Sequence, residues 1–243
     1  MKKEASYILV LLIVCSCTLL PTIPSKPYWI KERPPGTFAV NESLYCDEEE
    51  ISNLSWLEYL HWLKRVHGSS SSEYLTALPD TTIWLKMDSC LHPLSKRYLR
   101  GKIYHHVPVV GLSKDQIVAY SQWRTDRVFE GLLIRHKVIP HLFDQGPSNY
   151  FSVERYFKGS FEGIDPHPDF TYVPNYRLTE PNELEVVLSV LPKEGIWSKT
   201  EILNASPCAH LNGELTLLLQ SDSLHLATYS FRNVCTWEKY EED

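Results

Sequence analysis

The 243-residue sequence lacks several features that mark large classes of protein. It has no Gly-rich phosphate loop, no G-x-S-x-G turn and no C-x-x-C pair, so nucleotide-binding, hydrolase, zinc and thioredoxin-like classes have no motif to support them. Basic residues are also few, since 24 Lys and Arg stand against 30 Asp and Glu, a formal net charge of −6. This balance argues against nucleic-acid binding, which needs a basic stripe, and against polybasic attachment to anionic lipid.

The apolar run near the N-terminus is too short to cross a bilayer, which takes about 20 apolar residues. It follows Lys2 and Lys3, covers residues 8–14 and leads into Val14-Cys15-Ser16-Cys17. A small residue before a cysteine after such a run is typical of a bacterial lipoprotein signal, whose cleavage leaves the cysteine as a lipid-modified N-terminus. We therefore predict a signal peptide over residues 1–16 and a lipid anchor on Cys17. An ordinary signal peptide or a buried N-terminal strand is the alternative.

Few cysteines remain in the predicted mature chain, because Cys15 leaves with the signal and Cys17 carries lipid. The remaining four are Cys46, Cys90, Cys208 and Cys235. In an exported protein an even number is compatible with two disulfides, in any of three pairings. Free buried thiols are the other interpretation, and both stay open at this point.

The domain organisation is simple. Residues 17–35 are rich in proline and show little periodicity, so we predict an extended tether there. Residues 36–240 contain no repeat and no inner linker, which indicates one domain. Short strands are expected at 37–40 and 43–46, and strand-like alternation returns at 215–219, 224–229 and 231–237.

Three main helices are expected to begin near Ser55, Ser113 and Pro181. Capping-box patterns start the first two, and a proline in the first turn starts the third. Apolar residues at helical spacing place six side chains in the predicted core: Leu57, Leu60, Trp123, Leu184, Val187 and Leu188. Together with the strands, these helices indicate an α+β fold.

Five blocks in order along the domain resemble the formylglycine-generating enzyme (sulfatase-modifying factor) family. They are Ile51-Ser52-Asn53 with the following Trp56, Val107 to Ser113 with Trp123, Arg177-Leu178-Thr179-Glu180-Pro181-Asn182-Glu183-Leu184-Glu185, Leu211-x-Gly213 and Phe231-Arg232. Two further stretches, 77–84 and 122–127, are most similar to a lipoprotein branch that includes gliding-motility and type IX secretion lipoproteins of Bacteroidetes. This branch agrees with the predicted lipid anchor.

The resemblance implies an irregular α+β fold related to C-type lectin domains, with Trp123, Arg177, Glu183 and Arg232 at structural motif positions. The family's chemistry uses a pair of copper-binding cysteines, which lie between the fourth and fifth blocks. Here that interval, 219–230, contains neither cysteine nor glycine, and Ser121 replaces another cysteine of the family. We therefore predict no catalytic residue and no metal site.

One acidic loop leaves a cofactor open. Glu162, Asp165 and Asp169 carry the hard oxygen ligands that Ca²⁺ prefers, and the family binds calcium, although this loop matches none of its motifs closely. A solvated loop is the alternative.

The resulting expectation is a non-catalytic lipoprotein that acts as a structural or partner-binding component of the bacterial cell envelope. Its partners would be envelope proteins, and the resemblance links it to gliding motility or protein secretion. No acidic cluster follows Cys17, which favours the periplasmic face of the outer membrane. The alternative is a divergent formylglycine-generating oxidase acting on a sulfatase cysteine. A lectin-like glycan binder is a third class, supported only by fold analogy and by the Trp and Tyr residues expected to be exposed.

Overall fold

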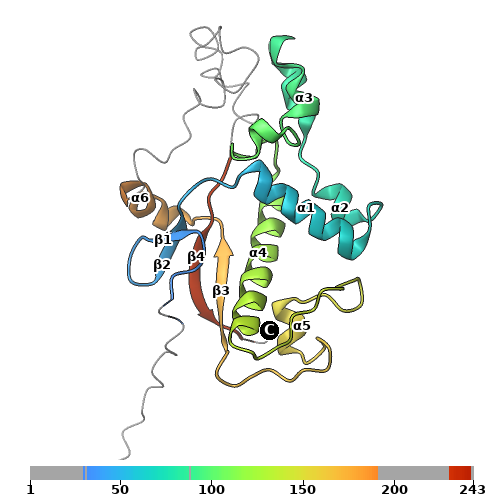
Figure 1. Cartoon of the computed structure of the whole chain (residues 1–243). Coiled ribbons are helices and arrows are strands. Elements are labelled where there is room, and N and C mark those ends of the chain that lie inside the picture. The colour runs from blue at the N-terminus through green and yellow to red at the C-terminus, as the bar shows by residue number, and fades with distance from the viewer. Residues whose placement is uncertain (1–29, 31, 88, 191–229, 242–243) are drawn as a thin grey trace, which may run out of the picture.

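The computed structural model describes residues 30, 32–87, 89–190 and 230–241. Within these residues the chain is an α+β protein with one four-stranded antiparallel sheet (Figure 1). The strands are β1 (Thr37–Ala39), β2 (Leu44–Asp47), β3 (Tyr172–Arg177) and β4 (Val234–Lys239), in the order β1-β2-β4-β3. The strands predicted at 37–40 and 43–46 are therefore confirmed. Those predicted at 215–219 and 224–229 lie outside the described residues.

Six α-helices and three 3-10 helices accompany the described sheet. The α-helices are α1 (Asn53–His67), α2 (Ser72–Thr76), α3 (Leu94–Arg97), α4 (Lys114–Arg135), α5 (Val153–Phe157) and α6 (Pro181–Val190). The 3-10 helices are η2 (Thr81–Lys86), η3 (Ser89–Leu91) and η4 (Lys102–Tyr104). None of the helices in these ranges has both the length and the apolar character of a membrane span.

The sheet register decides which side chains share a face. Tyr45 lies opposite Cys235, and Cys46 lies opposite Val234. Because successive side chains on a strand point to opposite faces, Tyr45 and Cys235 share one face while Cys46 and Val234 share the other. Helix α4 packs along β3 on one side of the sheet, and α6 lies on the opposite side (Figure 1). The small cluster of Cys46 and Val234 with Val187 identifies the face that meets α6.

The predicted helix starts agree with the structure to within two residues, but the predicted N-cap residue of the first helix is wrong. Ser113 caps α4 through a complete capping box with Gln116, as predicted. In α1 the cap is Ser52, whose Oγ accepts from the Ser55 N–H, so Ser55 is already inside the helix. The earlier start gives Asn53 a tertiary role, because its Nδ2 donates to the carbonyl oxygens of two residues, Tyr98 and Tyr104.

Two clusters contain most of the core around α4. The first joins α1, α4 and the segment before β4 through stacked and edge-on aromatic rings, with Trp56 fully buried at its centre. Of the predicted core residues, Leu60 is buried, and Leu57 and Trp123 are half-buried against this cluster.

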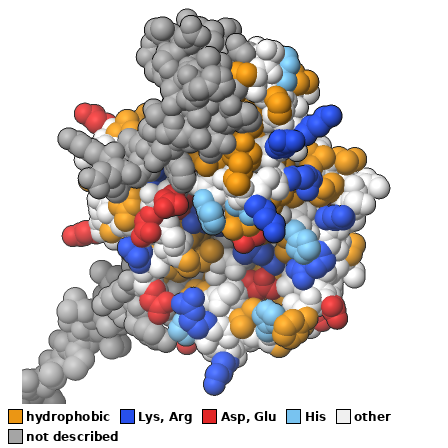
Figure 2. Space-filling model, turned by 45° about the horizontal axis from the view of Figure 1, so that its top comes forward, with side chains coloured by type: hydrophobic (Ala, Val, Ile, Leu, Met, Phe, Trp, Pro, Cys, Tyr) orange, Lys and Arg blue, Asp and Glu red, His pale blue; other side chains and the backbone are white. Residues whose placement is uncertain are grey.

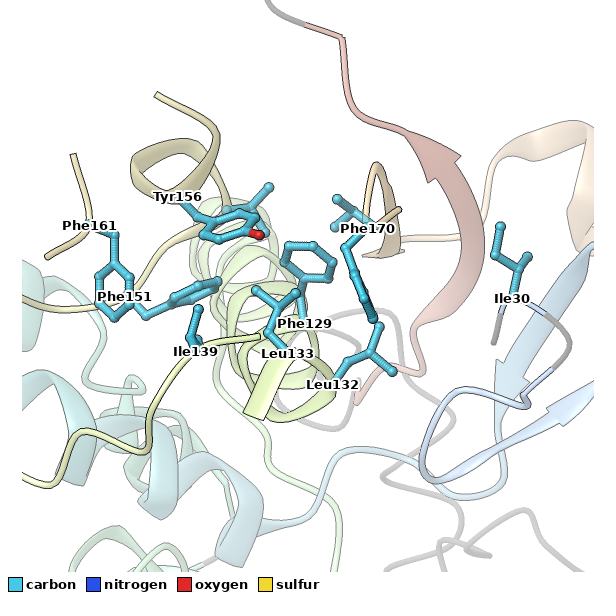
Figure 3. Close-up of a cluster of buried hydrophobic side chains, with 11 residues drawn as sticks. Ile30, Phe129, Leu132, Leu133, Ile139, Phe151, Tyr156, Phe161 and Phe170 are labelled. Atoms are coloured by element: carbon cyan, nitrogen blue, oxygen red, sulfur yellow. The ribbon is translucent and has the colours of Figure 1, made fainter. Parts of the chain in front are cut away.

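The second cluster packs the other part of α4 against α5 and the chain that surrounds it. Figure 3 shows Phe129 and Leu133 of α4 beside Tyr156 of α5 and Phe151. Ile30 belongs to the same cluster and is 6% exposed. The expectation that packed structure begins near Gly36 is therefore wrong, because the end of the predicted tether already lies on the domain.

Helix α6 corrects the predicted core most clearly. Val187 is buried, but Leu184 and Leu188 are 48% and 59% exposed. The reason is the ion pair that orients the helix: Glu183 binds Arg177 of β3. Residues 183 and 187 are four apart and share a helix face, so this contact turns that face toward the sheet and leaves Leu184 and Leu188 at its side.

An acidic side chain under the α4–α5 junction makes stability depend on pH. Asp126 is 8% exposed, and its Oδ1 accepts from the Val153 N–H at 2.9 Å. Burial raises the pKa of Asp126 from 3.8 to about 6, although the Val153 N–H works against the rise. The folded protein thus holds this proton more tightly than the unfolded chain, so the contribution of Asp126 is most favourable below pH 4 and declines as the pH rises to about 6.

Asp126→Asn should remove this decline, because the amide Oδ1 still accepts from Val153 and no longer titrates. The difference between pKa 3.8 and about 6 corresponds to about 3 kcal/mol, which is the most that the substitution could recover above pH 6. Urea unfolding of both proteins at pH 4, 5, 6 and 7 measures the difference, with the exposed Asp165→Asn as control. An unchanged difference across this range would contradict the assignment.

Candidate functional site

A recess of about 460 Å³ lies between the segment that follows β2 and the middle of α4. We call it the Asp47 recess. It is lined by Pro35, Gly36, the run 47–52, Ser55, Glu58, Tyr120, Trp123, Arg124, Arg127 and Val128. Glu48, Glu49 and Glu58 are exposed, whereas Asp47 and Tyr120 are buried. The recess therefore has carboxylates at its outer edge and an aromatic and charged floor.

Asp47 is the central residue of this floor. It is the last residue of β2, on the face that meets α4, and is 1% exposed. Its Oδ2 accepts from Arg124 Nη1 at 2.7 Å and from the Asn233 N–H at 2.9 Å. Its Oδ1 is buried without a hydrogen-bond partner in the described part of the chain. One acceptor of this carboxylate thus stays unused, at a cost in free energy.

Burial dominates the electrostatics of the pair. It raises the pKa of the Asp47 carboxyl above its usual value, and the Arg124 guanidinium offsets only part of that rise. Burial would lower the pKa of Arg124, but the Asp47 carboxylate outweighs it and the pKa lies above its ordinary range. Each partner therefore depends on the other, as expected for an ion pair removed from water.

The remaining contacts hold Arg124 rigidly. Its guanidinium lies 4.2 Å from the ring centroid of Tyr176, and its Nη2 donates to the Pro35 carbonyl oxygen at 3.2 Å. One turn earlier on α4, Ser121 Oγ contacts Asn233 Oδ1 at 2.8 Å. Ser121 thus connects α4 to the segment before β4.

Two residues singled out by the family resemblance line this recess or bind residues that line it. Arg232 Nη1 donates to the carbonyl oxygens of Asp47 and Glu48, which fixes the strand end and the turn after it. Trp123 lines the recess and packs against Tyr59 and Tyr120, with ring centroids 5.1 and 5.5 Å apart. Both residues support the site structurally.

The other two motif residues lie elsewhere. Arg177 donates to both carboxylate oxygens of Glu183 at 2.7 and 2.8 Å, a bidentate pair on the face of the sheet that meets α6. Glu183 Oε2 also accepts from the Glu180 N–H at 2.9 Å. This pair sets the start and orientation of α6, and it takes no part in the Asp47 recess.

Among the described cysteines, one forms a disulfide and two are free buried thiols, so each interpretation of the sequence applies to part of the set. Cys90 is disulfide-bonded, whereas Cys46 and Cys235 are free and fully buried. The register places Cys46 and Cys235 on opposite faces of the sheet, so their sulfurs neither pair nor meet at one metal. Burial raises the pKa of the Cys46 thiol to about 11 and that of Cys235 further. A disulfide for these two is therefore wrong. Cys17 and Cys208 lie outside the described residues.

The acidic loop suggested for calcium does not form a cluster. Glu162, Asp165 and Asp169 are all exposed. Within the ranges that the structure covers, no group of three His, Cys, Asp or Glu side chains is placed to hold a metal ion. The structure is that of the solvated loop.

The sequence alone does not reveal the central pair, because residues 47–50 form a run of carboxylates of the kind that usually lies in a solvated loop. One feature of the sequence does indicate a buried charge on α4. Arg124 lies four residues after Tyr120 and seven after Ile117, on the same helix face, so a charged side chain interrupts an otherwise inward stripe. A buried charge at such a position requires a partner, although the pattern does not say which one.

Figure 2 shows one face of the molecule, where acidic, basic and hydrophobic side chains are interspersed between the grey atoms. The exposed carboxylates and half-buried Trp123 of the Asp47 recess are suited to binding a positively charged group. The chain matches no protein-family model, no curated protein and no solved structure.

Proposed function

We propose that the chain is a non-catalytic lipoprotein that binds partner proteins in the bacterial cell envelope. A lipid on Cys17 would hold it at the periplasmic face of the outer membrane. The resemblance described above would link it to gliding motility or protein secretion. The disulfide at Cys90 supports an oxidising compartment, since such bonds persist outside the cytoplasm.

We further propose that its fold is an irregular one of the formylglycine-generating enzyme type. Three observations support this. The first and last described strands belong to one sheet, and Arg177 pairs with Glu183 inside one motif block. Trp123 lines the Asp47 recess, and Arg232 binds the carbonyl oxygens of Asp47 and Glu48, which line the same recess. The exposure of Leu184, within that same block, counts against it.

The Asp47 recess is the observation that carries the binding function. It is concave, large enough for one or two side chains of a partner, and built on a floor that an ion pair and several aromatic contacts hold in place. Its exposed carboxylates would attract a basic segment of the partner and steer it toward the recess in a salt-dependent way.

Crosslinking in envelopes tests this function. A photo-crosslinking residue replaces Ser55 at the recess or, as control, exposed Ser160, which follows α5 and does not line the recess. A specific product is expected only from position 55. It should be lost in the full chain carrying Glu49→Lys, and retained with Glu162→Lys, which makes the same charge change elsewhere. Equal products from both positions, or no effect of Glu49→Lys, would contradict a role for the recess.

The oxidase alternative needs two thiolates that converge on copper. Cys46 and Cys235 do not converge, which favours binding over catalysis as far as these two are concerned. Cu(I) titration of the reduced full chain, followed by oxygen-dependent turnover of a sulfatase-type cysteine peptide, decides between the two. Tight stoichiometric copper together with turnover would establish the oxidase.

The lipid anchor has its own test. Mass spectrometry of the mature N-terminus should find a lipid-modified Cys17, and Cys17→Ser should release the protein from membranes. A mature chain that begins elsewhere without lipid would refute the anchor, and it would leave the recess experiment unaffected.

A further inference from the structure

A second recess, separate from the one used above, lies on the other side of Arg127. It has a volume of about 400 Å³, and its polar lining residues come from three segments. Helix α1 contributes Trp62 and Arg65, α4 contributes Arg127 and Glu130, and the chain between α4 and α5 contributes His141 and Gln145. We call it the Arg65 recess.

The carboxylate and amide oxygens of this recess are already in use. Glu130 Oε2 accepts from Arg127 Nη1 at 2.6 Å, and Glu130 Oε1 accepts from Gln145 Nε2. Gln145 Oε1 accepts from the Phe151 N–H at 3.0 Å and from Arg127 Nη1 at 3.3 Å. Both acceptor side chains are buried, at 8% and 6% exposure. They are therefore poorly placed to bind a further donor.

Donors, in contrast, are left over. Arg127 Nε and Trp62 Nε1 are buried without a hydrogen-bond partner in the described ranges. The Arg127 guanidinium lies 4.8 Å from the Trp62 ring centroid, so the two groups are neighbours. Buried donors without acceptors are rare in folded proteins, and each costs free energy until an acceptor reaches it.

Positive charge is also in surplus. Arg65 is exposed, and its Nη1 donates to the Phe143 carbonyl oxygen at 3.1 Å, but within the described residues it forms no ion pair with a carboxylate. Burial lowers the pKa of Arg127 despite the nearby Glu130, and Arg65 acts in the same direction. A negative group placed between Arg65 and Arg127 would relieve this repulsion.

Apart from His141 and Gly131, the rest of the lining is apolar. Ile134, Leu142 and Phe143 line the recess, and the Phe143 side chain is 76% exposed. A large exposed aromatic ring beside unpaired donors is typical of a site that takes an apolar group next to a polar one.

We propose that the Arg65 recess binds an oxyanion carried beside an apolar group. A carboxylate on a short hydrocarbon chain has this chemistry, and it occurs both in free organic acids and at the C-terminus of a peptide that ends in an apolar residue. Arg65 makes the first, bidentate contact, and Arg127 with Trp62 supplies the inner donors after a small shift of their side chains. The hydrocarbon packs on Phe143.

The test uses hexanoate, hexylamine and inorganic phosphate as probes on the full chain, with tryptophan labelled with ¹⁵N on the indole. Hexanoate should shift the Trp62 indole N–H resonance, which Trp62→Phe identifies, and hexylamine should not. Arg65→Gln should weaken hexanoate binding about ten-fold, since a charged hydrogen-bond partner is lost. Lys64→Gln, the neighbouring exposed cation outside the recess, should leave the affinity unchanged.

A tripeptide ending in leucine, compared with its C-terminal amide, distinguishes the two sources. Binding of the free acid form only supports a peptide terminus, and binding of hexanoate alone supports a free organic acid. Phosphate weaker than hexanoate supports the apolar contact. Three results would overturn the proposal: a Trp62 shift with hexylamine, equal losses in Arg65→Gln and Lys64→Gln, or no hexanoate response at 50 mM.

Discussion

Asp47→Asn should lower the free energy of unfolding by about 3–5 kcal/mol, because it leaves the Arg124 guanidinium without its counter-charge. The pair is removed from water: the Arg124 and Asp47 side chains are 15% and 2% exposed, and their atoms lie 2.7 Å apart. The amide keeps an acceptor for the Asn233 N–H, so the loss measures the missing charge more than the missing hydrogen bond. Urea unfolding of the full chain gives the value.

The adjacent ion pair provides a matched control. Glu48 lies 3.4 Å from Arg33, and both side chains are more than half exposed. Glu48→Gln should therefore change stability by no more than about 0.5 kcal/mol. Similar effects of the two substitutions would show that the burial of Asp47 has no energetic consequence.

A double substitution distinguishes the coupling between the two side chains from the cost of burying a single charge. Asp47→Asn together with Arg124→Leu should recover part of the loss, because no unpaired charge remains in the interior. If the double variant were as unstable as the sum of the two single variants, the two side chains would be energetically independent, contrary to the contact seen here.

Trp56→Ala should cost about 3–5 kcal/mol, because Trp56 is fully buried where α1, α4 and the segment before β4 meet. Its ring stacks on Tyr120 at a centroid distance of 5.1 Å and meets Phe231 edge-on at 6.4 Å. Its Nε1 donates to the Ala77 carbonyl oxygen at 3.1 Å. Removing the ring therefore opens a cavity, breaks all its aromatic contacts and leaves a buried carbonyl unpaired.

Two further variants make this result specific. Trp56→Phe should lie between the wild type and Trp56→Ala, because it keeps a ring but loses the donor. Ile103→Ala, at a side chain that is 73% exposed, should change stability by no more than about 0.5 kcal/mol. A loss at Ile103 comparable with that at Trp56 would contradict the assignment of the core.

Features set by neighbours along the chain could be predicted from the sequence. The Ser113 cap and its partner Gln116 are three residues apart, and they start α4 as expected. The turn between β1 and β2 joins strands only four residues apart, so alternation and turn residues were sufficient. The α+β class followed from these local patterns, since helical and alternating periods are properties of short segments.

The tertiary structure alone decided the site. Asp47 and Arg124 are 77 positions apart, and only the placing of β4 between β2 and β3 brings Asn233 to the same carboxylate. The same register sends Cys46 and Cys235 to opposite faces, which no count of cysteines could show. In α6 the Arg177–Glu183 ion pair determines which face of the helix is buried, and this face differs from the one that the apolar stripe predicts. An ion pair between a strand and a helix fixes the rotation of the helix about its axis, whereas periodicity gives only a preference for one face.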